Sequence, residues 1–262
     1  MLAGQMALVT GGGRGLGRAF AARLAALGCD IALHGMREHG PSEYGGSQSL
    51  SEVAAQLAAE HGVRVARLLG DLTRTEDVAR VVGEAEQRLG PIDILVHNAG
   101  GDIAAAGGKP DPNDVVHISE TDVRAVIERN LHSTIFVCQK VAQGMMARRR
   151  GRIVTLSSVA AFRARSHSAI YAVAKAGAQH FTRCLADQLR PYEITVNAIA
   201  PGDTRTERYL ATRPVDPAHL VEKSTLARIA LVDEVARVVE FFAGPMGAFV
   251  TGQVLRVDGG EQ

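Results

Sequence analysis

Short runs of apolar residues alternate along the chain with longer segments in which apolar positions recur at a helical period. The short runs are rich in Val, Ile, Leu and Ala, which is typical of strands. We predict strands at Met6–Thr10, Asp30–His34, Arg64–Leu69, Ile92–His97, Arg152–Ser157, Ile194–Ile199 and Gln253–Val257. Helical periodicity is clearest over Leu16–Leu27, Leu50–His61, Glu76–Leu89 and Thr121–Ala147.

Most of these strands are apolar on successive residues rather than on alternate ones. That pattern predicts burial on both faces, as in a parallel sheet covered by helices on each side. Right-handed crossovers then produce an α/β fold, a doubly wound, seven-stranded parallel sheet of Rossmann-like type. We expect a single domain over residues 1–262 whose ligand cleft lies at the carboxyl ends of the strands.

Three irregular segments, each of which leaves the carboxyl end of a predicted strand, interrupt the alternation. They are Gly35–Ser49, Gly101–His117 and Asp203–Thr225. Long loops in compact domains are more often functional than incidental. We therefore expect all three to border the cleft.

Composition narrows the classes of partner. The formal net charge is +1 and Trp is absent. Neither observation favours binding to nucleic acid or to a membrane surface. The three cysteines lack CxxC spacing and the nine histidines show no paired metal-ligand motif, so we predict no metal site. The N-terminus lacks the features of a secretion signal, and a cytoplasmic location is expected.

The first predicted strand runs directly into Thr10-Gly-Gly-Gly-Arg-Gly-Leu-Gly17 and then into a helix. Glycines let the backbone turn tightly and approach a ligand closely. The start of the following helix presents unpaired N–H groups and the positive end of its dipole to an anion. A simple connecting turn is the alternative, but the position after the first strand favours a dinucleotide site.

Tyr171 and Lys175 lie four residues apart and therefore on one face of a helix. A nearby ammonium favours the phenolate, so we expect Lys175 to lower the pKa of Tyr171 towards working pH. Ser158 follows the fifth predicted strand and should lie at the same edge of the cleft, whereas Ser157 should point the other way. By itself this pair would be unremarkable on an exposed helix.

Taken together, these motifs resemble those of the short-chain dehydrogenase/reductase family. The resemblance covers essentially the whole chain. It includes the glycine turn with its TGxxxGxG spacing, Tyr171-Ala-Val-Ala-Lys175, Asp71-Leu72, His97-Asn98-Ala99-Gly100, Asn130, Ser158, Pro201-Gly202 and the segment from Thr251 to Gly260. His97 departs from the family pattern, which usually has Asn there.

The resemblance implies four catalytic residues. Tyr171 would exchange a proton with the carbonyl or alcohol oxygen, and Ser158 would hydrogen-bond the same oxygen. Lys175 would lower the pKa of Tyr171 and hold the nicotinamide ribose. Asn130 would hold a water in a proton relay to Lys175, and its alternative role is to bend the helix locally.

The resemblance also implies the residues that bind the dinucleotide. They are Gly11, Arg14, Gly15, Leu16, Gly17, Arg37, Asp71, Leu72, Asn98, Ala99, Gly100, Tyr171, Lys175, Pro201, Gly202, Thr204 and Thr206. Asp71 would accept a hydrogen bond from the adenine amino group, although the sequence around it also resembles a helix start, where it would act as a cap.

Selectivity for NAD needs a carboxylate at the end of the second strand, where this chain has His34-Gly35. Arg37 after that strand and Arg14 in the glycine turn could pair with the 2′-phosphate of NADP. Two solvated surface arginines are the alternative reading. We therefore favour NADP(H) and keep NAD(H) open.

The expected reaction interconverts a ketone or aldehyde with an alcohol, but its substrate is not evident from the residues. Lys109, Pro110 and Pro112 could form a pocket wall. Residues 203–225 resemble the family's substrate lid, from which Tyr209 and Leu210 could supply apolar contacts. Arg163, Arg165 and His167 could attract an anionic substrate or could form a solvated loop. The pattern is near that of 3-oxoacyl-thioester reductases and near that of polyol, sugar and other secondary-alcohol dehydrogenases.

Other classes of protein remain as alternatives. A non-catalytic dinucleotide-binding sensor would not need Asn130, Ser158, Tyr171 and Lys175 together. An epimerase or dehydratase usually carries a larger C-terminal domain. The resemblance further implies a homo-oligomer, either a tetramer or a dimer, that acts on a small-molecule carbonyl or alcohol.

Overall fold

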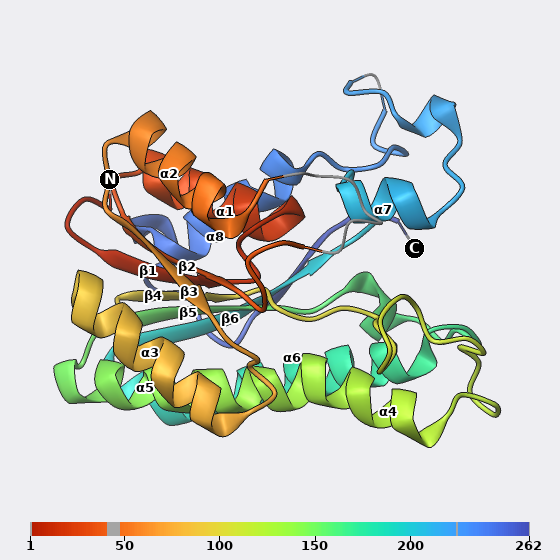
Figure 1. The fold of residues 1–262 in the computed structure, drawn as a ribbon, viewed down its shortest axis with the longest axis horizontal. Helices are drawn as coiled ribbons and strands as arrows, with labels where there is room; N and C mark the ends of the chain where they lie inside the picture. Colours follow the sequence, from red (N-terminus) through yellow and green to blue (C-terminus); the bar gives the residue numbers. More distant parts are fainter. Residues whose placement is uncertain (1, 41–47, 224, 262) are drawn as a thin grey trace.

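A parallel sheet with strand order β3-β2-β1-β4-β5-β6-β7 forms the centre of the computed structural model, which describes residues 2–40, 48–223 and 225–261 (Figure 1). The strands are β1 (Met6–Thr10), β2 (Asp30–Gly35), β3 (Val65–Leu69), β4 (Ile94–His97), β5 (Gly151–Leu156), β6 (Ile194–Pro201) and β7 (Val254–Val257). The α-helices are α1 (Gly15–Ala26), α2 (Leu50–His61), α3 (Thr75–Leu89), α4 (Glu120–Ile127), α5 (Ser133–Arg148), α6 (Ala169–Leu189), α7 (Glu207–Thr212) and α8 (Val232–Ala243).

Helices cover both faces of this sheet. Helices α1, α2 and α8 lie on one face and α3, α5 and α6 on the other (Figure 1). Each face has its own apolar cluster, and neighbouring residues of one strand enter different clusters: Val9 packs with Phe20 and Phe242, whereas Leu8 packs with Met145. The predicted doubly wound, Rossmann-like single domain is therefore confirmed.

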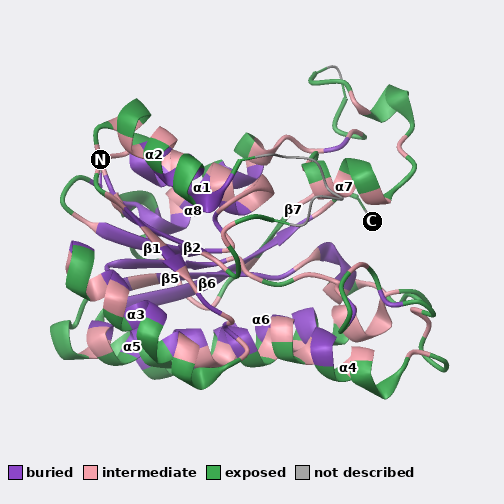
Figure 2. Cartoon of the chain, in the orientation of Figure 1, coloured by how far each residue is buried: buried purple, intermediate pink, exposed green. Residues whose placement is uncertain are grey.

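Burial differs between the central and edge strands. Strand β1 is buried throughout and β6 is buried along its whole length, as Figure 2 shows for the central strands. The edge strands β3 and β7 alternate or are partly exposed, and Leu255 in β7 keeps 42% of its surface exposed. The predicted burial on both faces thus holds for the centre of the sheet and not for its edges, because an edge strand has only one neighbouring strand.

One predicted helix, Thr121–Ala147, has a more complex course. It consists of α4, a π-helical turn at Glu128–His132 and then α5. The break falls around Asn130, and π turns inside α-helices are frequent at functional sites.

The loops expected at the cleft leave the carboxyl ends of β4 and β6. Loop 101–117 and the segment around α7 project from the same end of the sheet in Figure 1. The third loop, predicted at Gly35–Ser49, follows β2, and its residues 41–47 lie outside the described residues. The strand ends therefore position most of the residues that the sequence singles out.

Candidate active site

The glycine turn after β1 packs closely on the first turn of α1. A side chain at position 17 would overlap the carbonyl oxygen of Gly11, so this approach requires glycine. Arg14, the N-cap of α1, is extended, and its side chain makes no capping hydrogen bond. The helix start therefore keeps N–H groups and a positive dipole end for an anion, and this cradle fits the pyrophosphate of a dinucleotide.

The end of β4 lies against this turn. The side-chain amide of Asn98 donates to the carbonyl oxygens of Thr10 (3.2 Å) and Gly11 (3.1 Å). The backbone N–H groups of Asn98 and Ala99 both donate to Thr10 Oγ1 at 3.0 Å. These bonds hold Asn98, Ala99 and the adjoining Gly100 beside the phosphate cradle, where the resemblance places the adenosine ribose.

Two buried histidines, which the sequence reasoning did not assign, connect these strand ends. His34 lies between β1 and β3, with Nε2 3.0 Å from the Gly70 carbonyl oxygen and Nδ1 accepting from the Gly11 N–H at 3.4 Å. Burial lowers the pKa of His34 to about 4. His34 is therefore neutral at pH 7 and acts as a brace for the glycine turn.

His97, at the end of β4, is the second of these histidines. Its Nδ1 lies 3.2 Å from Thr10 Oγ1, and its Nε2 lies 3.4 Å from Ser133 Oγ at the start of α5. Burial lowers the pKa of His97 to about 3, with the nearby Lys175 charge acting in the same direction. The neutral imidazole thus links the glycine turn to the helix that contains Asn130. The signal that could have found both histidines is a polar residue inside an otherwise apolar strand end.

Asp71 closes a local turn after β3. Its Oδ1 accepts from the backbone N–H of Thr73 at 3.0 Å and from Thr73 Oγ1 at 2.8 Å. Helix α3 begins at Thr75 and its N-cap is Arg74, so the alternative of Asp71 as a helix cap is wrong. Leu72 is buried in the apolar cluster on the α3 side of the sheet.

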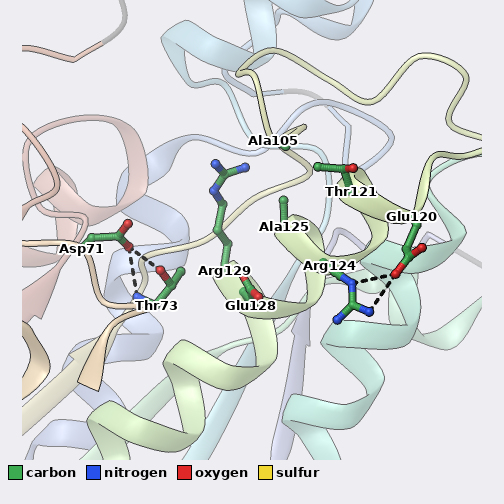
Figure 3. A pocket seen from close by; sticks show the side chains of 9 residues that line it. All are labelled: Asp71, Thr73, Ala105, Glu120, Thr121, Arg124, Ala125, Glu128 and Arg129. Carbon is green, nitrogen blue, oxygen red and sulfur yellow. Dashed lines mark hydrogen bonds and ion pairs between the residues drawn. The ribbon is translucent and has the colours of Figure 1, made fainter. Parts of the chain in front are cut away.

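A hollow of about 580 Å³ opens beside Asp71, between the end of β3 and helix α4 (Figure 3). Its lining residues are Asp71, Thr73, Ala105, Glu120, Thr121, Arg124, Ala125, Glu128 and Arg129. Arg124 pairs with Glu120 at 2.7 Å, and Arg129 donates to the carbonyl oxygens of Ile103 and Ala104 at 2.7 and 2.6 Å. The hollow therefore lies beside Asp71, and Tyr171 does not line it.

Tyr171 and Lys175 lie on α6 beside the end of β5. The Lys175 Nζ lies 5.8 Å from the centroid of the Tyr171 ring and donates to the Leu156 carbonyl oxygen at 2.7 Å. Lys175 is buried, and burial lowers its pKa to about 8. An ammonium held in this way fits the role of binding neutral hydroxyl groups.

The pKa of Tyr171 is shifted in the direction opposite to the one expected from the sequence. Burial of the ring raises this pKa above its ordinary value, and this effect outweighs the lowering by the Ser158 hydroxyl and then by Arg208. The predicted lowering by Lys175 is therefore wrong for this structure, because desolvation of the phenolate dominates. Tyr171 is a protonated phenol at neutral pH, which suits a proton donor.

Ser157 and Ser158 contact different residues of α6. Ser158 Oγ accepts from the Ala160 N–H at 3.2 Å and lies beside Tyr171. Ser157 Oγ donates to the Lys175 carbonyl oxygen at 3.2 Å and accepts from Gln179 at 2.8 Å. The structure thus brings Ser158, Tyr171 and Lys175 together and leaves Ser157 in the packing of α6.

Asn130 is fully buried in the π-helical turn. Its amide Nδ2 donates to the carbonyl oxygens of Gly101 and Val126, and its Oδ1 accepts from the Gly101 N–H, each at 2.8 Å. Both amide donors are therefore used by the backbone. This geometry fits the alternative role of shaping the helix and also ties it to loop 101–117; the water relay stays a prediction.

The segment after β6 returns across the glycine turn. The Thr206 methyl lies 3.3 Å from the point where a Cβ on Gly15 would be, and Thr206 Oγ1 caps α7 by accepting from the Tyr209 N–H at 3.1 Å. Thr204 Oγ1 donates to the Gly202 carbonyl oxygen at 3.0 Å. Pro201 is the buried end of β6. This segment therefore borders both the phosphate cradle and the approach to Tyr171.

The remaining candidate arginines lie in two separate places. Arg37 is exposed after β2, and the Arg14 guanidinium lies beside Gly40 of the same loop. Both thus lie at the end of β2, as expected for a 2′-phosphate. Arg163 instead pairs with Glu261 at 2.8 Å in the C-terminal segment, and His167 forms a β-bridge with Asp114. The structure does not present Arg163 and His167 as one anion-binding cluster.

Neither a metal-binding cluster nor a membrane-spanning helix is found within the described ranges. No group of three or more His, Cys, Asp or Glu side chains in them is placed to hold a metal ion. None of the described helices combines the length and the apolar character needed to span a membrane.

Comparisons with known proteins place this geometry in a family. A family model described as enoyl-(acyl carrier protein) reductase matches residues 11–262. The chain is 34% identical to a cyclohexanol dehydrogenase of Rhodococcus sp. (strain TK6) over 264 residues, which cover 99% of this chain and 96% of that protein. It is also 34% identical to an acetoacetyl-CoA reductase of Allochromatium vinosum over 256 residues, which cover 98% of each.

Two solved structures are similar to this chain over nearly its whole length. The crystal structure of levodione reductase matches with a TM-score of 0.84 and 28% identity, covering 99% of this chain and 98% of that one. A 7α-hydroxysteroid dehydrogenase complexed with NADH and 7-oxo glycochenodeoxycholic acid matches with a TM-score of 0.83 and 28% identity, covering 99% and 94%. The chain belongs to the short-chain dehydrogenase/reductase family and is an oxidoreductase that interconverts alcohols and carbonyl compounds.

Proposed function

We propose that the protein is an NADP(H)-preferring reductase of ketones in which Tyr171 donates the proton. The observation that carries this proposal is the convergence of Tyr171, Ser158 and Lys175 at the carboxyl end of β5, at the same end of the sheet as the uncapped start of α1. A non-catalytic sensor is disfavoured because the similar proteins are enzymes.

Tyr171, Ser158 and Lys175 would each perform a different part of the reaction. A bound nicotinamide would supply the hydride. The Tyr171 hydroxyl, protonated at neutral pH, would donate its proton to the carbonyl oxygen. The Ser158 hydroxyl would donate a hydrogen bond to the same oxygen and stabilise the charge that develops there. Lys175 Nζ would hold the ribose hydroxyls, since its pKa of about 8 keeps it mainly protonated at pH 7.

Asn130 would act through its backbone in this scheme. Its carbonyl oxygen accepts from Thr134 Oγ1 at 2.7 Å, and a carbonyl oxygen can accept a second hydrogen bond. A water held there would return a proton towards Lys175 and Tyr171 after each reduction. The side chain of Asn130 would position that carbonyl by fixing the π-helical turn.

The dinucleotide would lie along the strand ends. Its pyrophosphate would bind at Gly11, Gly15, Leu16 and Gly17, its adenosine beside Asp71, Leu72, Asn98, Ala99 and Gly100, and its carboxamide at Pro201, Gly202, Thr204 and Thr206.

The preference for NADP(H) rests on charge at the end of β2. The nearest acidic residue along the chain after β2 is Glu38, which pairs with Arg67 at 2.6 Å and accepts from the Ser51 N–H at 2.9 Å. That carboxylate is therefore committed to protein groups. Arg14 and Arg37 bring two guanidinium groups to the same strand end. Guanidinium favours a phosphate over a hydroxyl.

For the substrate we propose a 3-oxoacyl thioester first, on the strength of the similarity to acetoacetyl-CoA reductase. A cyclic secondary alcohol and its ketone are the second candidate, supported by the similarity to cyclohexanol dehydrogenase. We further propose that residues 203–225 act as the substrate lid, and that the protein is a cytoplasmic homotetramer or homodimer, as the family resemblance implies.

A substrate panel tests the reaction. Acetoacetyl-CoA and cyclohexanone should each be reduced, with loss of reduced nicotinamide followed by absorbance. Turnover of neither compound nor of wider ketone and aldehyde panels, in a protein that still binds the dinucleotide, would contradict the proposal.

A separate comparison tests the cofactor. Wild type should have a higher kcat/KM with NADPH than with NADH, and Arg14→Ala and Arg37→Ala should each lower that ratio about tenfold by removing a charge-assisted contact. Arg23→Ala is the control, because Arg23 pairs with Glu240 on α8. A preference for NADH that neither test variant changes would refute the NADP(H) proposal.

A further inference from the structure

Helix α6, which carries Tyr171, begins differently from the other helices that have a serine N-cap. Its N-cap is Ser168, whose φ of 61° lies in the left-handed region that favours glycine, and whose side chain makes no capping hydrogen bond. The serine N-caps of α2 and α4 are extended, and each accepts a hydrogen bond from the backbone N–H three residues later. In α6 the residue at that position is Tyr171 itself.

A carboxylate from loop 101–117 holds Ser168 instead of a local cap. Ser168 Oγ donates to Asp102 Oδ2 at 2.8 Å, and the side-chain amide of Asn113 donates to the same oxygen at 2.8 Å. The Ser168 backbone N–H donates to the Asn113 carbonyl oxygen at 2.9 Å. Both the hydroxyl and the backbone N–H of Ser168 are thus bonded to a loop that lies far away along the chain.

The backbone around Asp102 is itself anchored. The Asn130 side chain bonds to both the N–H and the carbonyl oxygen of Gly101, each at 2.8 Å. Arg208 donates to the Asp102 carbonyl oxygen at 2.7 Å. Arg129 donates to the carbonyl oxygens of the next two residues at 2.7 and 2.6 Å. The Asp102 carboxylate therefore extends from a fixed backbone, as a side chain must if it is to hold another element in place.

The left-handed conformation of Ser168 has to be imposed by its surroundings. A residue with a Cβ adopts that conformation only at a cost in energy. The hydrogen bonds from Ser168 to Asp102 and Asn113 oppose its return to an extended conformation. Three residues later the chain reaches Tyr171, whose phenol lies beside Ser158. Because the first turn of a helix follows directly from its N-cap, the direction of the Tyr171 side chain depends on the conformation of Ser168.

We propose that Asp102 is a positioning residue for the proton transfer: its carboxylate holds the left-handed turn at Ser168 and thereby the direction of the Tyr171 hydroxyl. This inference rests on the proposed function, because it assigns to Asp102 an effect on the proton donor of that same site. Asp102 Oδ1 is buried, which favours an action through Ser168 over a direct contact with the substrate. The competing explanations are a role in stability alone and such a direct contact.

Removal of either partner of the hydrogen bond tests the proposal in the complete protein. The measurements are kcat and KM for reduction of acetoacetyl-CoA or cyclohexanone at saturating dinucleotide. Asp102→Ala and Ser168→Ala should each lower kcat about 10- to 100-fold, the cost of a small misplacement of a catalytic group, and should leave KM near wild type. The double variant should lose no more activity than Asp102→Ala, because both substitutions remove the same hydrogen bond.

Two further variants separate the conformation of the turn from its chemical groups. Asp102→Asn keeps an oxygen that accepts from Ser168 and should therefore retain most of the wild-type kcat. Ser168→Gly lacks the hydroxyl, but glycine adopts the left-handed region freely, so kcat should fall less than in Ser168→Ala. A kcat of Ser168→Gly no higher than that of Ser168→Ala would contradict a role of this conformation.

Ser119→Ala is the matched control. It removes the N-cap hydroxyl of α4, which accepts from the Asp122 N–H, and should lower the melting temperature without changing kcat. Unchanged kcat in Asp102→Ala and Ser168→Ala, with a lower melting temperature, would show a role in stability alone and overturn the inference. Additive losses in the double variant, or a raised KM in Asp102→Ala alone, would show that Asp102 acts independently of Ser168 and would overturn it too.

Fluorine NMR keeps the inference testable if no ketone is turned over. In protein labelled with 3-fluorotyrosine, the Tyr171 resonance is assigned by its loss in Tyr171→Phe. It should shift or broaden in Asp102→Ala and Ser168→Ala and stay as in wild type in Ser119→Ala. A resonance that neither test substitution changes would overturn the inference. Failure of every ketone to react, with the resonance changed as expected, would contradict only the proposed function.

Discussion

The cradle after β1 and the wall over Tyr171 lie at the same end of the sheet but are built from different parts of the chain. The cradle is backbone: Gly11 and Gly17 touch, Asn98 clamps the turn, and His34 braces it from β2. The wall consists of loop 101–117 and the segment around α7, which are joined where Arg208 Nη2 donates to the Asp102 carbonyl oxygen.

This difference has a physical basis. A dinucleotide pyrophosphate is bound by N–H groups and a helix dipole, which any sequence can supply provided that no side chain obstructs the approach. The cradle therefore needs glycines at set positions. Substrates vary, and their recognition depends on which side chains the loops bring together. We expect damage to the cradle to affect stability and dinucleotide binding together, and damage to the wall to affect chemistry or specificity alone.

The largest effect should come from Tyr171→Phe. Removing the hydroxyl removes the proton donor and should lower kcat by about 100- to 10,000-fold, the usual contribution of a general acid. The measurement is kcat for ketone reduction at saturating dinucleotide. The melting temperature serves as the control and should stay near wild type. A variant that keeps more than a tenth of wild-type kcat would show that another group donates the proton.

A smaller effect, in the cradle, should come from Gly17→Ala. The added methyl would overlap the Gly11 carbonyl oxygen, so the free energy of unfolding should fall by about 1–3 kcal/mol, as for other overpacked sites. The affinity for the dinucleotide should fall with it. Urea unfolding and a dinucleotide titration measure the two changes.

Gly83→Ala is the matched control for this substitution. Gly83 lies in the interior of α3, and a Cβ there would meet no atom within 4 Å. The same substitution should raise stability by about 1 kcal/mol or less, because alanine favours a helix. If both variants changed stability in the same direction, the close approach of Gly17 to Gly11 would not explain the result.

An effect similar in size to that of Gly17→Ala should appear in the pH dependence of stability. His34 and His97 are neutral when folded, with pKa values of about 4 and about 3, whereas an unfolded histidine titrates near 6.5. The unfolded chain therefore binds more protons below pH 6.5. The stability that is fully present above that pH should be lost as the pH falls, by about 3 kcal/mol between pH 6.5 and 5 for the two groups together.

His97→Asn tests this account. It removes one buried imidazole and should reduce the loss of stability over that range to about half, measured by urea unfolding at several pH values. His180→Asn, at an exposed position of α6, should leave the loss unchanged. An undiminished loss in His97→Asn would mean that other groups cause it.

Much of the fold could be read from hydrophobic pattern. The predicted strands agree with the observed ones to within two residues, because five of the seven are largely buried on both faces and are rich in apolar residues. The break at Glu128–His132 was missed, since it depends on the bonds between Asn130 and Gly101, which lie far apart along the chain. The direction of the pKa shift of Tyr171 was wrong for a similar reason: burial depends on what packs around the ring.

The sequence alone predicted the doubly wound sheet, the dinucleotide cradle and the grouping of Ser158, Tyr171 and Lys175. It could do so because periodicity, glycine placement and helical spacing are local properties. Only the tertiary structure revealed His34 and His97 as neutral braces and Arg208 near the Tyr171 phenol. Those assignments depend on distances between segments that are remote in the chain, and on the desolvation that close packing imposes.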